Sequence, residues 1–299
     1  MISAVVLTKN EEKNIKECLS GLKWCDEILV VDDDSDDKTI EMAERFGANV
    51  IKRSLNGDFA GQRNFGLKNT KGDWVLFVDA DERVSKELAD EIKESVKKDD
   101  VNGFYFRRID NFMGKWLKHG EIGGIRILRL AKKSGGNWTR KVDEIWEIKG
   151  KIKTLKNPLL HYSHPTMTEF FTSINERSTL NAKEFYDGGR RITLIEWLKP
   201  KTKFIQNYFF RLGFLDGTQG FVFAVLMSLH SFLVRGKLYL LWQREKKDPP
   251  PLKLWRTGRR ASAGSLEKGF FLIWAIFVFA SYIYFLFQRG LSKWSSWRF

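Results

Sequence analysis

The chain has 299 residues, of which 43% are hydrophobic, and its formal net charge is +14. Residues 1–100 carry a net charge of −7 and the remaining residues a net charge of +21, so the acidic and basic side chains are concentrated in different halves. Because the basic half is also rich in Trp and Phe, its composition favours contact with anionic membrane lipids and argues against nucleic acid as a partner.

Two features favour a reducing, cytosolic compartment. Cys18 and Cys25 are the only cysteines, which excludes a disulfide framework and a cysteine-based zinc site. The first residues form a short apolar run followed at once by charges, a pattern that does not resemble a signal peptide.

The first hundred residues alternate between strand and helix patterns. Continuous apolar runs predict strands that are covered on both faces, as in a parallel sheet. Strands are expected at 2–8, 27–32, 48–53 and 73–79, and helices at 10–22, 36–47 and 59–70. This alternation predicts right-handed strand–helix–strand units and a Rossmann-like α/β sheet.

Polar residues follow three of these strands where each strand ends. Lys9-Asn10-Glu11 follow the first strand, Asp32-Asp33-Asp34 end the second, and Asp79-Ala80-Asp81 end the fourth. Ligands bind at the carboxyl ends of parallel strands, so these side chains are expected to converge. Acids after strands also form turns and helix caps, but three such clusters together favour a binding site.

Asp79 and Asp81 are two residues apart, which places both side chains on the same side of an extended chain. Two carboxylates in one site repel each other unless a cation lies between them. Mg²⁺ or Mn²⁺ is suited to this place, because these ions bind one or two carboxylates together with substrate phosphates. The sequence has neither a G-x-x-x-x-G-K-[ST] loop nor a G-x-G-x-x-G turn, which argues against kinase and dinucleotide chemistry.

From residue 101 the pattern changes to longer, mixed strands at 101–109, 123–130 and 142–151, and then to helices at 167–186, 192–214 and 220–242. The segment 220–242 is strongly apolar but contains His230, Arg235 and Lys237. It predicts a helix in the membrane interface whose basic residues meet lipid headgroups.

Gly269 to Phe287 is a run of 19 residues without a charge, which reaches the length of a membrane span. It follows the triple proline Pro249–Pro251 and a basic stretch. By the positive-inside rule, a transmembrane helix here places residues 1–268 in the cytoplasm.

Four blocks in this order, LTKNEE, VVDDDSDDKT, AGQRNFGL and GDWVLFVDADE, resemble the nucleotide-sugar glycosyltransferases of family 2. More closely, they are similar to the subgroup that adds glucose or a related sugar to the lipopolysaccharide inner core. The resemblance covers roughly residues 1–245 and implies a GT-A fold, a nucleotide-diphosphate sugar donor and inversion at the anomeric carbon. It also implies that the last Asp of the D-x-D motif holds Mg²⁺ or Mn²⁺.

The resemblance assigns roles to individual positions. Those implied to contact the nucleotide sugar are Thr8, Asn10, Glu11, Asp32, Gln62, Arg63, Asn64 and Asp79, and those implied to hold the metal are Asp79 and Asp81. The family's V-H-E block corresponds here to Val142-Asp143-Glu144, so Glu144 is the candidate general base. Asp143 replaces the usual His, which leaves open which carboxylate acts.

We therefore expect a membrane-bound hexosyltransferase with a lipid-linked or lipopolysaccharide-core acceptor, acting at the cytoplasmic face of the inner membrane. The expected organisation is a GT-A catalytic domain at 1–165 with nucleotide-binding (1–100) and acceptor (101–165) halves, a membrane-associating helical region at 166–248, a linker at 249–268, a transmembrane helix at 269–287 and a tail at 288–299. The alternatives are a sugar nucleotidyltransferase, which would normally have a basic, Gly-rich signature at the first strand, and a non-catalytic membrane scaffold.

Overall fold

The structure is a computed structural model that describes residues 1–97, 100–162, 166–193 and 195–244. These residues belong to one compact unit, Met1–Leu252, and a second unit comprises Lys253–Phe299. The expected linker at 249–268, transmembrane helix at 269–287 and tail at 288–299 lie outside the described residues.

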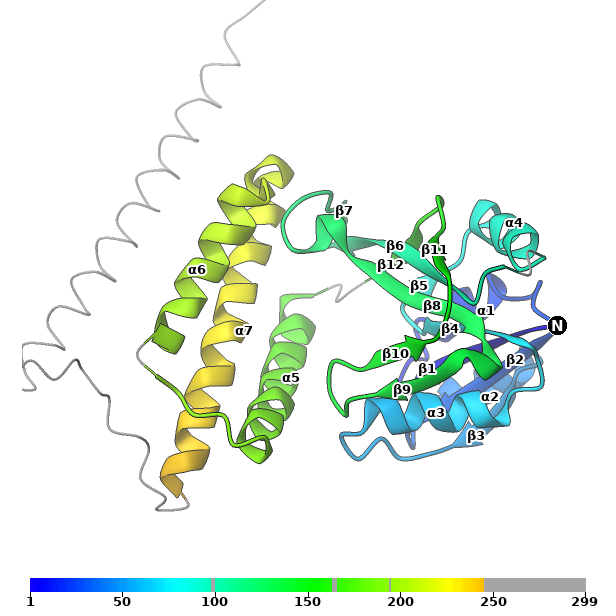
Figure 1. The fold of residues 1–299 in the computed structure, drawn as a ribbon, viewed down its shortest axis with the longest axis horizontal. Coiled ribbons are helices and arrows are strands. Elements are labelled where there is room, and N and C mark those ends of the chain that lie inside the picture. The colour runs from blue at the N-terminus through cyan, green and yellow to red at the C-terminus, as the bar shows by residue number, and fades with distance from the viewer. Residues whose placement is uncertain (98–99, 163–165, 194, 245–299) are drawn as a thin grey trace, which may run out of the picture. The chain divides into compact units, whose positions relative to one another are not determined.

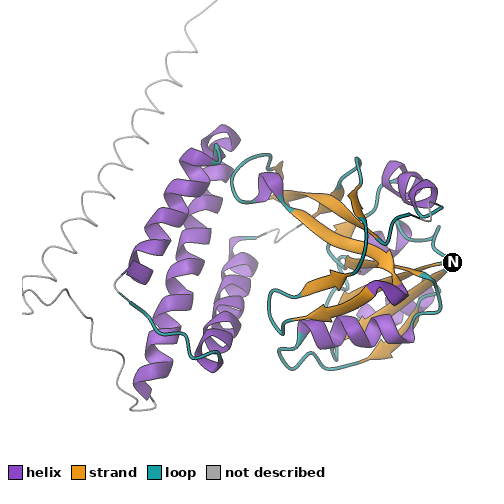
Figure 2. Cartoon of the chain, viewed as in Figure 1, coloured by secondary structure: helices purple, strands orange, loops and turns teal. Residues whose placement is uncertain are grey.

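The first half of the described chain is built on a mixed sheet whose neighbouring strands run in the order β3-β2-β1-β4-β8-β6-β12-β5 (Figures 1 and 2). Strands β1 to β4 are parallel, and β8 joins β4 in the antiparallel direction. The bounds are β1 Ile2–Thr8, β2 Glu27–Asp32, β3 Asn49–Lys52, β4 Trp74–Asp79, β5 Glu82–Arg83, β6 Gly103–Phe112, β8 Arg126–Lys132 and β12 Leu159–His161. The predicted Rossmann-like parallel sheet is therefore confirmed.

Shorter strands complete this half. Strand β7, Lys115–Trp116, and β11, Ile152–Thr154, both pair with β6, while β9, Gly136–Thr139, and β10, Ile145–Ile148, form a separate hairpin. The strand expected at 142–151 is reduced to β10, because Asp143 has a left-handed backbone (φ 51°) that interrupts an extended chain.

Helices cover both faces of the parallel strands. They are α1 Ile15–Ser20, α2 Thr39–Arg45, α3 Phe59–Asn69 and α4 Lys86–Ser95. Alternate residues of each strand point to opposite faces. Ala4 and Val6 of β1 therefore belong to the core that contains Leu19 of α1 and Leu88 of α4, whereas Val5 packs with Leu67 of α3.

Three helices follow the sheet: α5 Met167–Asp187, α6 Lys199–Ile205 and α7 Gly217–Arg244 (Figure 1). The single helix expected at 192–214 is instead divided into the 3₁₀ turn Ile195–Leu198, α6, a π turn at Gln206–Phe210 and the 3₁₀ turn Gly213–Asp216. Pro200 favours a helix start at this position, since it lacks a backbone N–H to donate.

A third core attaches these helices to the sheet. The rings of Phe170 on α5 and Phe223 on α7 pack against Phe112 at the end of β6, with centroids 5.4 and 5.5 Å away. The Asp216 carboxylate accepts hydrogen bonds from the backbone N–H groups of Lys118 and His119, at 3.0 and 2.8 Å. The helices and the sheet edge therefore share one packed boundary.

Helix α7 with its preceding turn, Gly213–Arg244, is long and apolar enough to cross a membrane by length and composition, and 28% of its most apolar window is buried. Its basic residues do not project outward as the sequence suggested. Lys237 Nζ donates to Asn175 Oδ1 and Ser178 Oγ of α5, both at 2.8 Å, and Arg235 Nη2 lies 3.3 Å from Glu196 Oε2. The expectation that these basic residues meet lipid headgroups is thus wrong for Lys237 and Arg235, because Lys237 donates to α5 and Arg235 pairs with Glu196.

Candidate functional site

A cavity of about 700 Å³ lies at the carboxyl ends of the parallel strands. The register pairs Thr8 with Asp32 and Leu7 with Asp79, so β1, β2 and β4 end at the same level. Lining residues from these ends are Thr8, Lys9, Glu11, Asp33, Asp79 and Asp81, and further walls come from α3, the segment after β9, α5, α6 and α7. The expected convergence of the strand-end side chains at one edge is therefore observed.

Asp79 is neutralised by two arginines. Arg63 Nη2 of α3 donates to Asp79 Oδ1 at 3.0 Å, and Arg129 Nη2 of β8 donates to Asp79 Oδ2. Burial alone would raise the pKa of Asp79, but the positive charges of Arg129 and Arg63 hold it well below its usual range. Asp79 is thus an ionised carboxylate with both oxygens already engaged by protein donors.

Glu82, three residues after Asp79, is fully buried and shares Arg129 with it. Its Oε1 lies 3.2 Å from Arg129 Nη2, and its Oε2 accepts a hydrogen bond from the backbone N–H of Asp79 at 2.9 Å. Burial raises the pKa of Glu82 above its usual range, against the effect of Arg129. Glu82 therefore fixes the turn that follows β4 and presents Asp79.

Asp81 faces a histidine that the sequence reasoning missed. His161 Nε2 lies 3.0 Å from Asp81 Oδ2, and its Nδ1 lies 3.1 Å from Asp110 Oδ2. Burial opposes protonation of His161, but the carboxylates of Asp81 and Asp110 raise its pKa to about 10. Strand pairing explains the contact, since β12 ends at His161 and pairs with β5, which begins directly after Asp81.

These residues fit a divalent cation in part. The described residues contain no group of three or more His, Cys, Asp or Glu side chains that could hold a metal alone. Asp81 offers one carboxylate, and substrate phosphates would supply the other oxygen ligands. His161, whose raised pKa keeps it protonated between Asp81 and Asp110, holds the Asp81 carboxylate in place. Asp79 fits less well than predicted as a metal ligand, because both its oxygens bind arginines.

The two candidate bases lie on the same segment of the cavity wall. Glu144 Oε1 accepts a hydrogen bond from Arg63 Nε at 2.7 Å, so Arg63 joins Glu144 to Asp79. The Arg63 guanidinium also lies over the Trp138 ring, 4.8 Å from its centroid. Asp143 is exposed and lines the cavity too. The choice between Asp143 and Glu144 stays a prediction.

In the turn that the sequence predicts to contact the nucleotide, some residues line the cavity and others support the loops around it. Thr8 Oγ1 donates to Asp32 Oδ1 at 2.9 Å, and Asp32 Oδ2 accepts from the backbone N–H of Ser35 at 2.8 Å. Asp32 is fully buried and does not line the cavity, whereas its neighbour Asp33 does. The contact that the sequence assigned to Asp32 stays a prediction, and Asp33 is the acid of this strand end that faces the cavity.

Asn10 and Glu11 show the same division. The Asn10 backbone is left-handed (φ 54°), and its Oδ1 accepts from the backbone N–H of Asp36 at 3.0 Å, which joins the ends of β1 and β2. Glu11 lines the cavity, and burial raises its pKa to about 7 against a hydrogen bond from Asn14. Glu11 therefore changes protonation near neutral pH.

On α3, Gln62 and Arg63 line the cavity while Asn64 does not. Gln62 Nε2 donates to the Arg53 carbonyl at 3.2 Å. The Asn64 amide pairs with the backbone of Trp138, donating at 2.8 Å and accepting at 2.9 Å, and so fixes β9 against α3. The helix thus positions both Arg63 and the hairpin beside Glu144.

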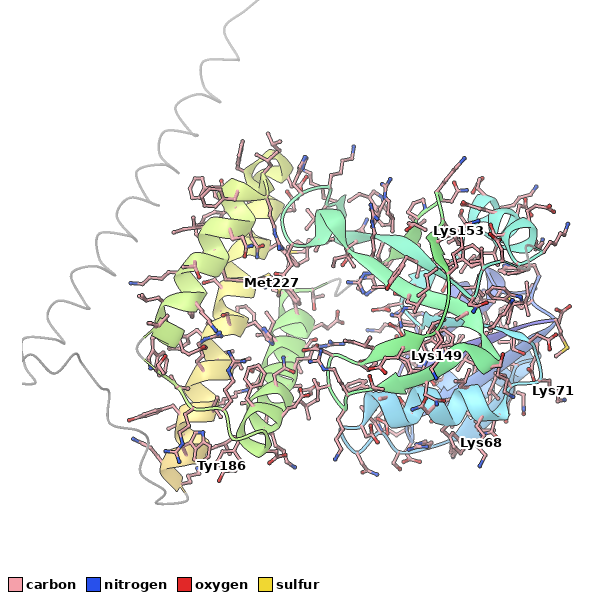
Figure 3. All side chains as sticks on the ribbon, viewed as in Figure 1. Lys68, Lys71, Lys149, Lys153, Tyr186 and Met227 are labelled. Atoms are coloured by element: carbon pink, nitrogen blue, oxygen red, sulfur yellow. The ribbon has the colours of Figure 1, made fainter. Side chains whose placement is uncertain are left out.

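The far part of the cavity consists of residues to which the sequence assigned no role or, for His230, a surface position. They include Glu121, which precedes the 3₁₀ turn Ile122–Gly124, as well as Arg177 and Asn181 of α5, Lys203 of α6, and Met227 and His230 of α7. Met227 is labelled in Figure 3. Basic and polar residues at helical spacing are also typical of solvated helix faces. The periodicity of the sequence alone therefore could not indicate that these residues line a cavity.

Comparisons with known proteins agree on one family. The sequence model described as glycosyl transferase family 2 matches residues 3–177. The uncharacterized glycosyltransferase RC0292 of Rickettsia conorii is 28% identical over 258 residues, covering 79% of this chain and 89% of that protein. The lipopolysaccharide core biosynthesis glycosyltransferase LpsC of Rhizobium meliloti is 27% identical over 248 residues, covering 80% and 92%.

Solved structures are more distant. The mannosyltransferase PcManGT of Pyrobaculum calidifontis, in complex with GDP-Man and Mn²⁺, aligns with a TM-score of 0.49 and 14% identity, covering 81% of this chain and 87% of that one. TarS of S. aureus in complex with UDP-GlcNAc aligns with a TM-score of 0.42 and 15% identity, covering 82% and 87%.

Proposed function

Because the chain belongs to glycosyl transferase family 2, we propose that it is an inverting, metal-dependent enzyme that moves a hexose from a nucleotide-diphosphate sugar, a UDP-sugar, to a lipid-linked or lipopolysaccharide-core acceptor. The observation that carries the proposal is the cavity at the strand ends. It brings an acidic edge, Asp81 with His161, into the same space as the candidate base Glu144.

The donor half of the proposal rests on the strand ends. Thr8, Glu11 and Gln62 line the region where a nucleotide would lie, while Asn10, Asp32 and Asn64 hold the surrounding loops through hydrogen bonds. Asp81 is the residue that would hold Mg²⁺ or Mn²⁺, and His161 positions its carboxylate. When bound, the ion supplies positive charge that neutralises the diphosphate as it leaves.

The transfer itself needs a base and a leaving group. The acceptor hydroxyl oxygen attacks the anomeric carbon while the bond from that carbon to the diphosphate oxygen breaks. The proton of the acceptor hydroxyl passes to Glu144, with Asp143 as the alternative base. The leaving nucleoside diphosphate takes the bonding electron pair. Arg63 holds the Glu144 carboxylate in place through its 2.7 Å hydrogen bond, which supports Glu144 as the positioned base.

The acceptor half of the proposal rests on the helices and on one relative. LpsC is named for lipopolysaccharide core biosynthesis. Exposed apolar side chains lie on α7 and on the turns before and after α6, including Phe210, which is 80% exposed. These features support an enzyme at the cytoplasmic face of the inner membrane, in contact with anionic lipids, with the transmembrane helix at 269–287 as its predicted anchor.

The decisive experiment is a transfer assay with a panel of nucleotide sugars and native membranes, read by mass spectrometry of the lipids. We expect hexose transfer with Mn²⁺ or Mg²⁺ and its loss with EDTA. Asp81→Asn should lower kcat/KM at least about a hundredfold, because it removes the carboxylate that would hold the metal. Asp90→Asn, on the exposed face of α4, is the matched control and should retain activity. Full activity of Asp81→Asn would remove the metal role, and release of pyrophosphate from a nucleoside triphosphate would indicate a nucleotidyltransferase instead.

A further inference from the structure

A second cavity, of about 330 Å³, lies among α5, α6, α7 and the segment that joins α5 to α6, and we call it the helix cavity. Its charged and titratable lining residues are Arg190, Lys199, Lys203, His230 and Arg235. Asn181, Lys203 and His230 also line the cavity at the strand ends, so the two cavities share a wall. A ligand in the first cavity can therefore extend towards the second.

The helix cavity carries an excess of positive charge. Arg190, Lys199 and Arg235 all contact one carboxylate, Glu196, at 3.2, 2.5 and 3.3 Å. Burial alone would raise the pKa of Glu196, but hydrogen bonds from Lys199 and Arg190 hold it below its usual range. Three cations around one ionised carboxylate leave a formal charge of +2 at this wall. Lys203 pairs separately with Glu121, at 2.5 Å.

Polar atoms in this wall lack partners. Among the described residues, Asn181 Oδ1, His230 Nε2 and Arg235 Nε are buried without a hydrogen-bond partner, and all three residues line the helix cavity. Buried polar atoms in proteins are almost always hydrogen-bonded, so such a group points to a missing ligand, ion or water. The guanidinium N–H and the imidazole are suited to an oxygen-rich ligand.

A purely structural role explains only part of this arrangement. A single cation would be enough to neutralise Glu196 and to join α6 to the preceding turn. A purely structural cluster of that kind would have no surplus positive charge and no unsatisfied polar atoms. Of the three cations, Arg235 is the most buried, with 12% of its side chain exposed, and it carries most of the cost of desolvation. Arg190 and Lys199 keep 39% and 42% of their side chains exposed, so solvent screens part of their repulsion, but their charges still exceed the one carboxylate that they share. The wall is therefore more basic than the packing of the three helices requires.

We propose that the helix cavity binds an anionic group, a phosphate or a carboxylate, that is carried by the acceptor. This inference rests on the proposed glycosyl transfer, because the acceptor must reach both Glu144 and the shared wall. It names the acceptor class as a phosphorylated or carboxylated glycan. The site would hold that group while the reacting hydroxyl lies in the cavity at the strand ends.

The first test measures inorganic phosphate binding to the full chain in detergent, by calorimetry, with UDP in excess to occupy the strand-end cavity. We expect Lys199→Gln to weaken phosphate binding about tenfold, because one charge-assisted hydrogen bond is lost. Glu196→Gln should strengthen it, because the competing carboxylate is removed. Lys149→Gln, at an exposed residue directly after β10 that Figure 3 labels, should change nothing.

The two opposed variants separate binding from folding. If the cluster were only structural, both Lys199→Gln and Glu196→Gln would lower Tm and neither would change phosphate affinity, and that result would overturn the proposal. UDP binding, measured first in each variant, reports on the proposed function separately. If the wild-type chain did not bind UDP, that result would count against glycosyl transfer. The effect of the two variants on phosphate affinity would still decide whether the helix cavity binds an anion.

The second test identifies the source of the anion. With native membranes as acceptor in mixed micelles, Lys199→Gln should raise the amount of membrane that gives half-maximal transfer and leave kcat nearly unchanged. Flotation with phosphatidylcholine vesicles, with and without phosphatidic acid, measures headgroup binding. If Lys199→Gln reduced binding to phosphatidic acid but not the use of the acceptor, the cavity would belong to a lipid headgroup and the assignment to the acceptor would be wrong.

Discussion

At the carboxyl end of β4, each acidic side chain is matched by a cation from a distant part of the chain. Asp79 is held by Arg63 and Arg129, and Asp81 by His161. An unpaired carboxylate in a buried position costs several kcal/mol, so such a cluster requires partners. The sequence indicates that these acids need positively charged partners. The structure shows that arginine and histidine side chains of the protein already supply much of that charge without a metal.

Glu144 and Asp143 can be distinguished by substitution. If Glu144 is the base, Glu144→Gln should lower kcat by about 10²–10⁴-fold with little change in the KM for the donor, because proton removal is lost while the donor contacts remain. Asp143→Asn should have a small effect, and Asn also tolerates the left-handed backbone of this position. Steady-state kinetics with the preferred donor, and Tm for both variants, provide the measurement. A larger loss of kcat in Asp143→Asn would assign the base to Asp143.

Among the elements, α3 contributes both lining and supporting residues to the site. It carries Gln62 and Arg63 into the cavity and Asn64 onto β9. Its close approach to the sheet depends on Gly66, where an added Cβ would lie 2.7 Å from Val5 Cγ1 and 3.2 Å from Val31 Cγ2. Since Gly66 is one turn after Arg63, the contact with β1 and β2 also fixes the position of the guanidinium.

Gly66→Ala should therefore affect both stability and activity. The added methyl group has no free space, so α3 must move away from the sheet, which should cost about 1–3 kcal/mol in the free energy of unfolding. Urea unfolding measures this cost, and kcat/KM should fall as Arg63 shifts relative to Asp79 and Glu144. Lys68→Ala, an exposed position on the same helix that Figure 3 labels, should remain within about 0.5 kcal/mol of the wild type. A Gly66→Ala chain as stable and active as the wild type would show that the contact is easily relieved.

Helix α7 combines a polar inner side with an exposed apolar side. Lys237 donates to α5, and Tyr186 of α5, labelled in Figure 3, packs against Trp242 of α7 with ring centroids 4.5 Å apart. Burial lowers the pKa of Lys237 below its usual range. Val225, Phe232 and Leu240, by contrast, are exposed and follow a helical spacing.

For the whole molecule, the exposed apolar side chains of the α6–α7 region argue for a lipid contact. Phe209, Phe210, Leu212 and Leu215 are all exposed around the turn between the two helices, together with Arg211. Apolar residues gathered beside basic ones are typical of surfaces that enter the membrane interface. The predicted lipid contact is independent of whether 269–287 spans the membrane.

A fluorescent probe at Phe210 tests the contact in the full chain. In a Cys25→Ser background, with Cys18 buried, Phe210→Cys labelled with the fluorophore NBD should show a blue shift and higher intensity on addition of anionic vesicles, because the probe leaves water. Lys68→Cys, on α3, is the control and should show no change. Identical spectra for both probes with and without vesicles would place this turn outside the membrane.

The sequence by itself determined the parallel sheet, the level at which β1, β2 and β4 end, the family and the acids at the strand ends, because apolar periodicity and local motifs are set by nearby residues. Only the tertiary structure decided which cations meet those acids, that Asp33 rather than Asp32 faces the cavity, and that Lys237 and Arg235 point inward. His161 reaches Asp81 from 80 residues away. Contacts over such separations depend on how strands pair and helices pack, and a basic residue has the same local pattern whether it faces solvent, lipid or a buried carboxylate.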